Sequence, residues 1–338
     1  MIRYSAPDDA CIPAGGLPRL AIDYAVSRGA LPRDLVRGTG IPGDGLPRAG
    51  SLLSPAQYLQ LLANVTRQLA SPETSFMLGQ HALPGPDEAL ATALRSAGSL
   101  RHALELLCLW AGQLSPLLRP RLHESGGQGV LLWSDSYGAP ALRPQLVEMQ
   151  MTAVVSLARW LGGQRLPWTF CFNRARPRHA EQHEVHLGPD LRFDCQLDAM
   201  LLDAARLDQP WPAAGSPVSG AALLRAGLAG LPLPSLLDCL YDYLLAEVRN
   251  HPTLESASLA FGVSPATLKR HLARCGTHFL AELDMVRTHV ALHLFQSQGA
   301  DNQAVARYLG FHDAANFRRS FKRWTGLTPA LLRAALGA

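Results

Sequence analysis

Two stretches near the C-terminal end combine positive charge with apolar side chains at helical spacing. In the later stretch Asp313 precedes Phe317, Phe321 and Trp324, whose spacing is typical of one buried helix face. The opposite face is positively charged, with Arg318, Arg319, Lys322 and Arg323, and no acidic residue follows Asp313. Guanidinium and ammonium groups on one helix face can bind phosphates and the acceptor atoms of guanine. The pattern predicts a helix that lies in the major groove of double-stranded DNA.

The same pattern occurs earlier in the chain. Ser264-Pro265 predicts a helix start, because serine caps the free amides of the first turn and proline fits its first position. Leu268 and Leu272 form the apolar side of this helix, and T-L-K-R-H-L (267–272) corresponds in position and chemistry to N-F-R-R-S-F (316–321). The sequence therefore predicts two helix-turn-helix units, at about 253–274 and 302–324.

Arg270 and Arg319 are the predicted base-reading residues. Each lies in the second turn of its helix, opposite the apolar side chains, and arginine can donate two hydrogen bonds to guanine O6 and N7. Arg274, Lys322 and Arg323 are predicted to contact phosphates, which position a protein on DNA without reading its sequence. A helix predicted over about 278–296 joins the two units and is about 27 Å long at 1.5 Å per residue. That length suits two major-groove contacts about one DNA turn, or about 34 Å, apart.

The pattern G-F-x5-F-x3-F-K-R-W-x-G-x-x-P over residues 310–329 resembles the signature of the AraC/XylS family of transcription regulators, with each residue in place. The resemblance extends back to about Ser235 and so covers the last third of the chain. It implies that Ala266 and Ala315, and also Lys269 and Arg318, face the DNA groove. Here the two alanines depart from the polar residues expected, and they can contact only a thymine methyl group. The resemblance also implies RNA polymerase as a partner and an activator more than a repressor.

The sequence pattern of the first two thirds of the chain predicts an α+β fold that is mainly helical. Helices are expected over about 17–40 with a break at Gly29-Ala30, and over about 54–65, 74–82, 87–97, 99–117, 144–162, 178–186 and 198–205. Short strands are expected at 119–124, 129–137, 168–173 and 191–193, and we expect them to form one antiparallel sheet. Ser125-Gly126-Gly127-Gln128 predicts a hairpin turn between the first two strands. Along the second hairpin strand, Leu131 and Trp133 lie on one face and Val130 and Leu132 on the other.

This part resembles the longer, helix-rich sensor domain of a subset of AraC-type regulators. The cues are F-x-F at 170–172, R-P-R-H-A-E-Q-H after it, L-R-F-D-C at 191–195 and L-D-A-x-L-L at 197–202. The resemblance implies a bound small-molecule effector. An N-terminal part that serves only self-association, as a homodimer, is the alternative.

Candidate sites for other chemistry are few in the first two thirds of the chain. Trp110, Trp133, Trp160 and Trp168 are candidates for lining an effector pocket, although tryptophans also fill cores. His179 and His183 have the spacing of a zinc pair on a helix, but the H-E-x-x-H order is absent and no third ligand is evident. No nucleophile elbow, phosphate-binding loop or dinucleotide fingerprint occurs. We therefore expect no enzyme activity, no metal and no cofactor.

Length and composition predict two domains in a chain of 338 residues. We place an N-terminal regulatory domain at 1–214, a linker rich in proline, glycine and alanine at 215–234, and an all-α DNA-binding domain at 235–338. The linker is either a tether through which one domain biases the other or a passive spacer. The net charge of +4 is modest, but both lysines of the chain, Lys269 and Lys322, fall in the predicted DNA-facing helices.

The expected location is the cytoplasm. The six cysteines are scattered without C-x-x-C pairs, which is typical of free thiols in a reducing compartment. The first residues lack the apolar core of a signal peptide, and the longest uncharged run, near 106–118, is too short to span a bilayer.

Overall fold

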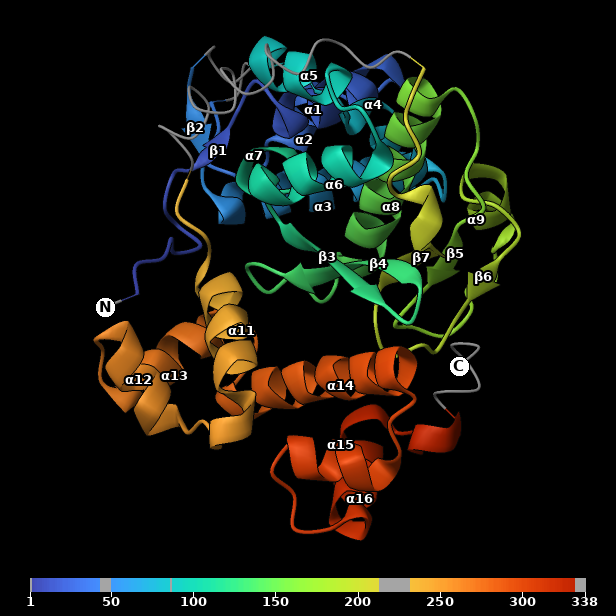
Figure 1. Cartoon of the computed structure of the whole chain (residues 1–338). Coiled ribbons are helices and arrows are strands. Elements are labelled where there is room, and N and C mark those ends of the chain that lie inside the picture. The colour runs from blue at the N-terminus through green and yellow to red at the C-terminus, as the bar shows by residue number, and fades with distance from the viewer. Residues whose placement is uncertain (1, 43–49, 86, 213–231, 332–338) are drawn as a thin grey trace.

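The computed structural model describes residues 2–42, 50–85, 87–212 and 232–331. A five-stranded sheet lies at its centre, with the N-terminal helices against one face and the C-terminal helices against the other (Figure 1). The helices of the N-terminal part are α1 Leu17–Ser27, α2 Pro32–Leu35, α3 Pro55–Leu69, α4 Thr74–Ala82, α5 Glu88–Arg95, α6 Leu100–Leu109, α7 Ala111–Leu114, α8 Arg143–Gly162 and α9 Glu181–His186.

The sheet has the strand order β3-β4-β7-β5-β6. Its strands are β3 Leu118–Ser125, β4 Gln128–Asp135, β5 Thr169–Cys171, β6 Leu191–Arg192 and β7 Ala199–Asp203. Neighbouring strands are antiparallel except for β5 and β6, which are parallel. A separate two-stranded sheet pairs β1, Ile12–Pro13, with β2, Leu52–Leu53.

Both faces of the central sheet are buried. Leu131 and Trp133 of β4 belong to the core that the N-terminal helices form, whereas Val130 and Leu132 belong to a second core shared with the C-terminal helices. Successive side chains of a strand point to opposite faces, so one strand supplies both cores. The predicted division of β4 into two faces is confirmed.

The C-terminal part is helical. It contains α11 Leu236–Glu247, α12 Leu254–Phe261, α13 Pro265–Arg274, α14 Phe279–Gln298, α15 Asn302–Tyr308 and α16 Ala314–Thr325. The long helix α14 runs beneath β3 and β4 and joins the pair α12–α13 to the pair α15–α16 (Figure 1). The predicted fold class, α+β followed by an all-α part with two helix-turn-helix units, is confirmed.

Three local predictions are wrong. Residues 198–205 do not form a helix: Ala199–Asp203 is strand β7, followed by a 3-10 turn at Ala204–Arg206. This strand lies between β4 and β5 and is buried on both faces, so its apolar residues show no alternation that would distinguish it from a helix. The sheet is not purely antiparallel, because β6 joins β5 in parallel. The expected helix at 99–117 ends at Leu109, and the short α7 follows.

Most of the predicted linker, residues 215–234, lies outside the described residues. No helix in the described ranges is both long enough and apolar enough to cross a lipid bilayer.

Candidate nucleic-acid interface and ligand pocket

Helix α13 begins as its sequence predicts. The Ser264 hydroxyl accepts a hydrogen bond from the Thr267 amide at 3.1 Å, and Pro265 occupies the first turn. Leu268 and Leu272 are fully buried. The helix is therefore held by one face, and its other face is open to solvent.

Helix α16 is capped by Asp313. The Asn316 amide donates to Asp313 Oδ1 at 2.7 Å, and the Asn316 side chain donates to Oδ2 at 3.0 Å. Asn316 in turn accepts a hydrogen bond from the Arg319 guanidinium at 2.5 Å. Phe317 and Phe321 are fully buried. The cap of α16 thus also orients Arg319.

All nine predicted DNA-facing residues are exposed: Ala266, Lys269, Arg270, Arg274, Ala315, Arg318, Arg319, Lys322 and Arg323. Within the described part of the chain, none of these cations forms an ion pair except Arg274, which pairs with Asp8. Unpaired cations on one helix face remain available to phosphates and base edges.

The N-terminal segment reaches the first helix-turn-helix unit, which sequence reasoning missed. The Tyr4 hydroxyl bonds to His271 Nδ1 at 2.9 Å, and the carboxylate of Asp8 pairs with Arg274 on the same helix. The Ile2 amide donates to the Ala260 carbonyl at 3.1 Å. The first residues carry no periodic or motif signal, so nothing in the sequence indicates this contact.

Helix α14 holds the second unit through its aromatic cluster. The Arg287 guanidinium lies 5.7 Å from the Phe311 ring centroid and 5.9 Å from that of Trp324, and Arg287 also pairs with Asp284 at 3.9 Å. Phe295 contacts Phe317 at a centroid distance of 6.2 Å. With 20 residues, α14 is about 30 Å long and carries one helix-turn-helix unit toward each end.

Two glycines allow the sheet to pack closely against the C-terminal helices. A Cβ atom on Gly138, which follows β4, would lie 1.8 Å from the carbonyl oxygen of Cys275 at the end of α13. A Cβ on Gly126, in the β3–β4 turn, would lie 2.4 Å from the carbonyl oxygen of Gln296 in α14. Both glycines also have a positive φ. Only glycine permits these two close approaches.

A polar chain crosses the same boundary. Arg121 of β3 forms an ion pair with Asp242, and its guanidinium carbon lies 3.9 Å from the ring centroid of Tyr241 in α11. The Tyr241 hydroxyl bonds to Nδ1 of His289 in α14 at 2.9 Å. Burial lowers the pKa of His289 to about 3, so this imidazole is neutral at physiological pH. Arg121, Tyr241 and His289 thus link the sheet, α11 and α14, and the residue on α14 in this chain, His289, is uncharged.

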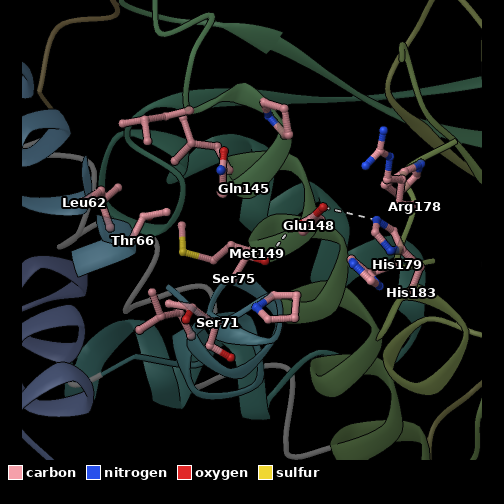
Figure 2. A pocket seen from close by; sticks show the side chains of 17 residues that line it. Leu62, Thr66, Ser71, Ser75, Gln145, Glu148, Met149, Arg178, His179 and His183 are labelled. Carbon is pink, nitrogen blue, oxygen red and sulfur yellow. Dashed lines mark hydrogen bonds and ion pairs between the residues drawn. The ribbon is translucent and has the colours of Figure 1, made fainter. Parts of the chain in front are cut away.

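A cavity of about 280 Å³ lies on the other side of the sheet, among α3, α4, α8 and the segment 177–183 (Figure 2). Gly79 brings α4 and α8 together there, because a Cβ would be 2.3 Å from the Met149 carbonyl oxygen. In Figure 2, Leu62, Thr66 and Met149 lie toward one end of the cavity, and Glu148, His179, His183 and Arg178 lie toward the other.

Glu148 is the buried acidic group of this cavity. Its Oε1 accepts from the Arg174 guanidinium at 2.5 Å and lies 3.1 Å from His183 Nε2, and its Oε2 accepts from the Ser75 hydroxyl at 2.5 Å. Burial raises the pKa of Glu148, but the hydrogen bond from His183, the charge of Arg174 and the bond from Ser75 outweigh it and hold that pKa below its ordinary value. The carboxylate is therefore ionised and internally neutralised.

The four tryptophans predicted to line a pocket lie elsewhere than around this cavity. Trp110, Trp133 and Trp168 are buried in the N-terminal core, Trp160 is 51% exposed on α8, and none of the four lines the cavity. Large indole rings fill the core itself, and the cavity forms where smaller side chains of α3, α4 and α8 meet. Sequence reasoning missed Glu148 and Ser75, because their partners are distant in the chain.

The histidine-rich segment does not assemble a metal site. His183 is buried against Glu148, whereas His179 is exposed. Among the described residues, no group of three metal-ligating side chains comes together.

Comparisons with known proteins match both parts of the chain. The family model of the arabinose-binding domain of AraC transcription regulators, N-terminal, matches residues 29–211, and a helix-turn-helix domain model matches 258–335. The ornithine utilization regulator of Pseudomonas aeruginosa is 28% identical over 327 residues, which are 95% of each chain. An uncharacterised HTH-type transcriptional regulator of Mycobacterium tuberculosis is 37% identical over 79 residues, 23% of each chain. The crystal structure of the transcriptional regulator CdpR from Pseudomonas aeruginosa aligns over 99% of both chains, with 18% identity and a TM-score of 0.46.

Proposed function

The chain is a DNA-binding transcription regulator of the AraC/XylS family with an arabinose-binding-like N-terminal domain, and on that premise we propose that a small-molecule effector in the α3–α4–α8 cavity controls its DNA binding. The observation that carries the proposal is the shared sheet. One face packs on the helices that line the cavity, and the other packs on α11 and α14. A shift of the cavity helices is therefore transmitted to the helix that spaces the two DNA-binding units.

We assign the DNA contacts by position and charge. Arg270 and Arg319 read bases, with Lys269, Arg318, Ala266 and Ala315 also facing the groove. Arg274, Lys322 and Arg323 contact phosphates. The exposure of all nine residues and the opposite, buried faces of α13 and α16 support this assignment.

Binding-site selection with the full-length protein, followed by titration of the selected DNA at several salt concentrations, tests DNA recognition. Contacts to about five phosphates give a log–log slope of about −4.5. Because the two units flank α14, Arg270→Ala and Arg319→Ala should each relax one base position, and the two positions should lie about ten base pairs apart. A response independent of salt, or both variants relaxing the same base pair, would contradict the assignment.

Effector control is tested by the same titration with and without a compound that binds the cavity. A change in operator affinity supports control, and an unchanged affinity with a filled cavity contradicts it. Activation through RNA polymerase is a part of the proposal that rests on family resemblance. A cytoplasmic location, which rests on the scattered cysteines and the N-terminal sequence, and a homodimer are further parts of it. Sedimentation of the full-length protein tests the homodimer.

A further inference from the structure

We infer that the α3–α4–α8 cavity takes a small organic acid, with one carboxylate and an apolar body, and not a sugar or an amine. The inference rests on the proposed function, in which this cavity holds the effector. It is carried by three features of the wall: an apolar end, an acidic residue that is already neutralised, and unpaired donors at the polar end.

The apolar end is unsuited to a sugar. Leu62 of α3, Leu78 of α4 and Leu146 and Met149 of α8 supply aliphatic and thioether surface to the cavity. Thr66 and Gln145 are the polar side chains near Leu62 in Figure 2, too few to partner every hydroxyl group of a sugar. A pentose exposes hydroxyl groups all around its ring, and each one buried without a partner costs about 1–3 kcal/mol. A ligand that is apolar over most of its surface gains from the same wall.

Glu148 excludes an amine as the main ligand. Both of its carboxylate oxygens accept hydrogen bonds from the protein, Oε1 from Arg174 and Oε2 from Ser75. With Arg174 and His183 beside it, this end of the cavity carries no uncompensated negative charge for an ammonium group. A buried cation without a counter-charge is strongly disfavoured.

The polar end instead offers free donors. Arg178 is an exposed residue at the rim of the cavity and, among the described residues, forms no ion pair and no hydrogen bond, whereas the nearby Arg176 is paired with Glu184 at 3.0 Å. The Nδ1 atom of His183, a residue only 3% exposed, also has no partner in the part of the chain that the structure describes. Nε2 of His183 lies 3.1 Å from Glu148 Oε1 and 2.8 Å from Arg174, so Nδ1 is the ring nitrogen left for a ligand, and it donates to a carboxylate when it carries a proton.

The start of α4 adds to this preference. Thr74 and Ser75 line the cavity in the first turn of α4, whose N-cap residue, Glu73, makes no side-chain capping bond and instead pairs with Arg28 at 3.7 Å. The Thr74 hydroxyl is buried and, within the described ranges, unpartnered. The amide end of a helix favours an anion. The Thr74 hydroxyl and His183 Nδ1 are thus two buried groups that line the cavity, have no partner among the described residues and can each donate to a carboxylate.

The volume sets the size of the acid. The cavity volume, about 280 Å³, is just below the usual range for ligand pockets, about 300–1,000 Å³. Acids of the size of benzoate or hexanoate fit this limit, and long-chain acids do not.

The test uses full-length protein, calorimetry and matched compounds: benzoate, benzamide and benzylamine; hexanoate, hexanamide and hexylamine; and arabinose. We expect each acid to bind at least about tenfold (about 1.4 kcal/mol) more tightly than its amide, and the amines and arabinose to bind more weakly still. In Arg178→Gln each acid and its amide should bind with dissociation constants within about twofold of each other, because the acid loses affinity and the amide keeps its own. Arg176→Gln is the matched control, because Arg176 does not line the cavity, and it should behave as wild type.

Four outcomes would overturn the inference: preference for an amine, preference for arabinose, no acid binding at millimolar concentration, or equal effects of Arg178→Gln and Arg176→Gln. The proposed function fails separately. If the acids bind in an Arg178-dependent manner and operator affinity does not change, the ligand class stands and effector control is refuted. If operator affinity responds to arabinose or an amine and to no acid, control stands and the ligand class is refuted.

Discussion

Replacing Gly126 by alanine should weaken the contact between the sheet and α14. The added Cβ would lie 2.4 Å from the Gln296 carbonyl oxygen, and an ordinary contact needs about 1 Å more. The colliding atom is backbone, so the hairpin tip and the last turns of α14 must separate. Forcing extra atoms into a packed contact costs about 1–3 kcal/mol.

The neighbouring turn residue gives a matched control. Gly127 has φ +77°, against +55° for Gly126, so alanine at either position carries left-handed backbone strain of about 1–2 kcal/mol. A Cβ on Gly127, however, meets no atom within 4 Å. The difference between the two alanine variants therefore measures the contact with α14, and we expect about 1–3 kcal/mol.

The assay is urea unfolding of the full-length protein, with limited proteolysis of the native state. Gly126→Ala should unfold at lower urea than Gly127→Ala, and the boundary between the sheet and the C-terminal helices should be cut faster. Equal unfolding free energies and equal cleavage rates in the two variants would refute the packing of the β3–β4 turn against α14 in solution.

Three further predictions concern the DNA-binding face and the cavity. Lys322→Ala should weaken binding to every DNA sequence alike and lower the salt slope of binding by about one. Arg319→Ala should reduce the binding free energy by about 1–3 kcal/mol and relax the preference at one base position. Fluorescence anisotropy with the selected operator and its single-base variants separates these two results. Asp8→Asn should free Arg274 from its ion pair and raise the salt slope of DNA binding by about one. Because the pair is exposed, the gain in binding free energy should be at most about 1 kcal/mol. An unchanged slope would show that Arg274 does not contact a phosphate. Glu148→Gln should destabilise the protein by about 3 kcal/mol at neutral pH, since it leaves Arg174 without its counter-charge. Because the folded-state pKa of Glu148 is lowered, its contribution is present above the unfolded-state pKa and lost as pH falls through the folded-state pKa, so the wild-type advantage in urea unfolding should shrink in acid; a constant advantage would contradict the pairing.

The helix-turn-helix units could be predicted from sequence because their determinants are local. Caps such as Ser264 and Asp313 act within one turn, and the apolar faces of α13 and α16 follow the helical period. The turn at Gly126-Gly127 has the same local character, since a two-residue hairpin loop of type I′ requires positive φ at both positions, and both glycines have it. The two faces of β4 were also predictable, because successive side chains along a strand point to opposite faces of the sheet.

What covers each face of the sheet was decided only by the tertiary structure. The fit of Gly138 against Cys275 and of Gly126 against Gln296 joins segments that no sequence period connects. Strand β7 was predicted as a helix, because a strand buried on both faces loses the alternation that identifies it.

The cavity shows the same division. The sequence showed a histidine-rich segment and scattered tryptophans, but Glu148 gained its role only when folding brought Ser75, Arg174 and His183 around it. Local hydrogen bonds and periodicity thus determined the helices of the two helix-turn-helix units. The cavity and the packing of the sheet on α14 depend instead on long-range packing, which is fixed by the shape and volume of side chains far apart in the chain.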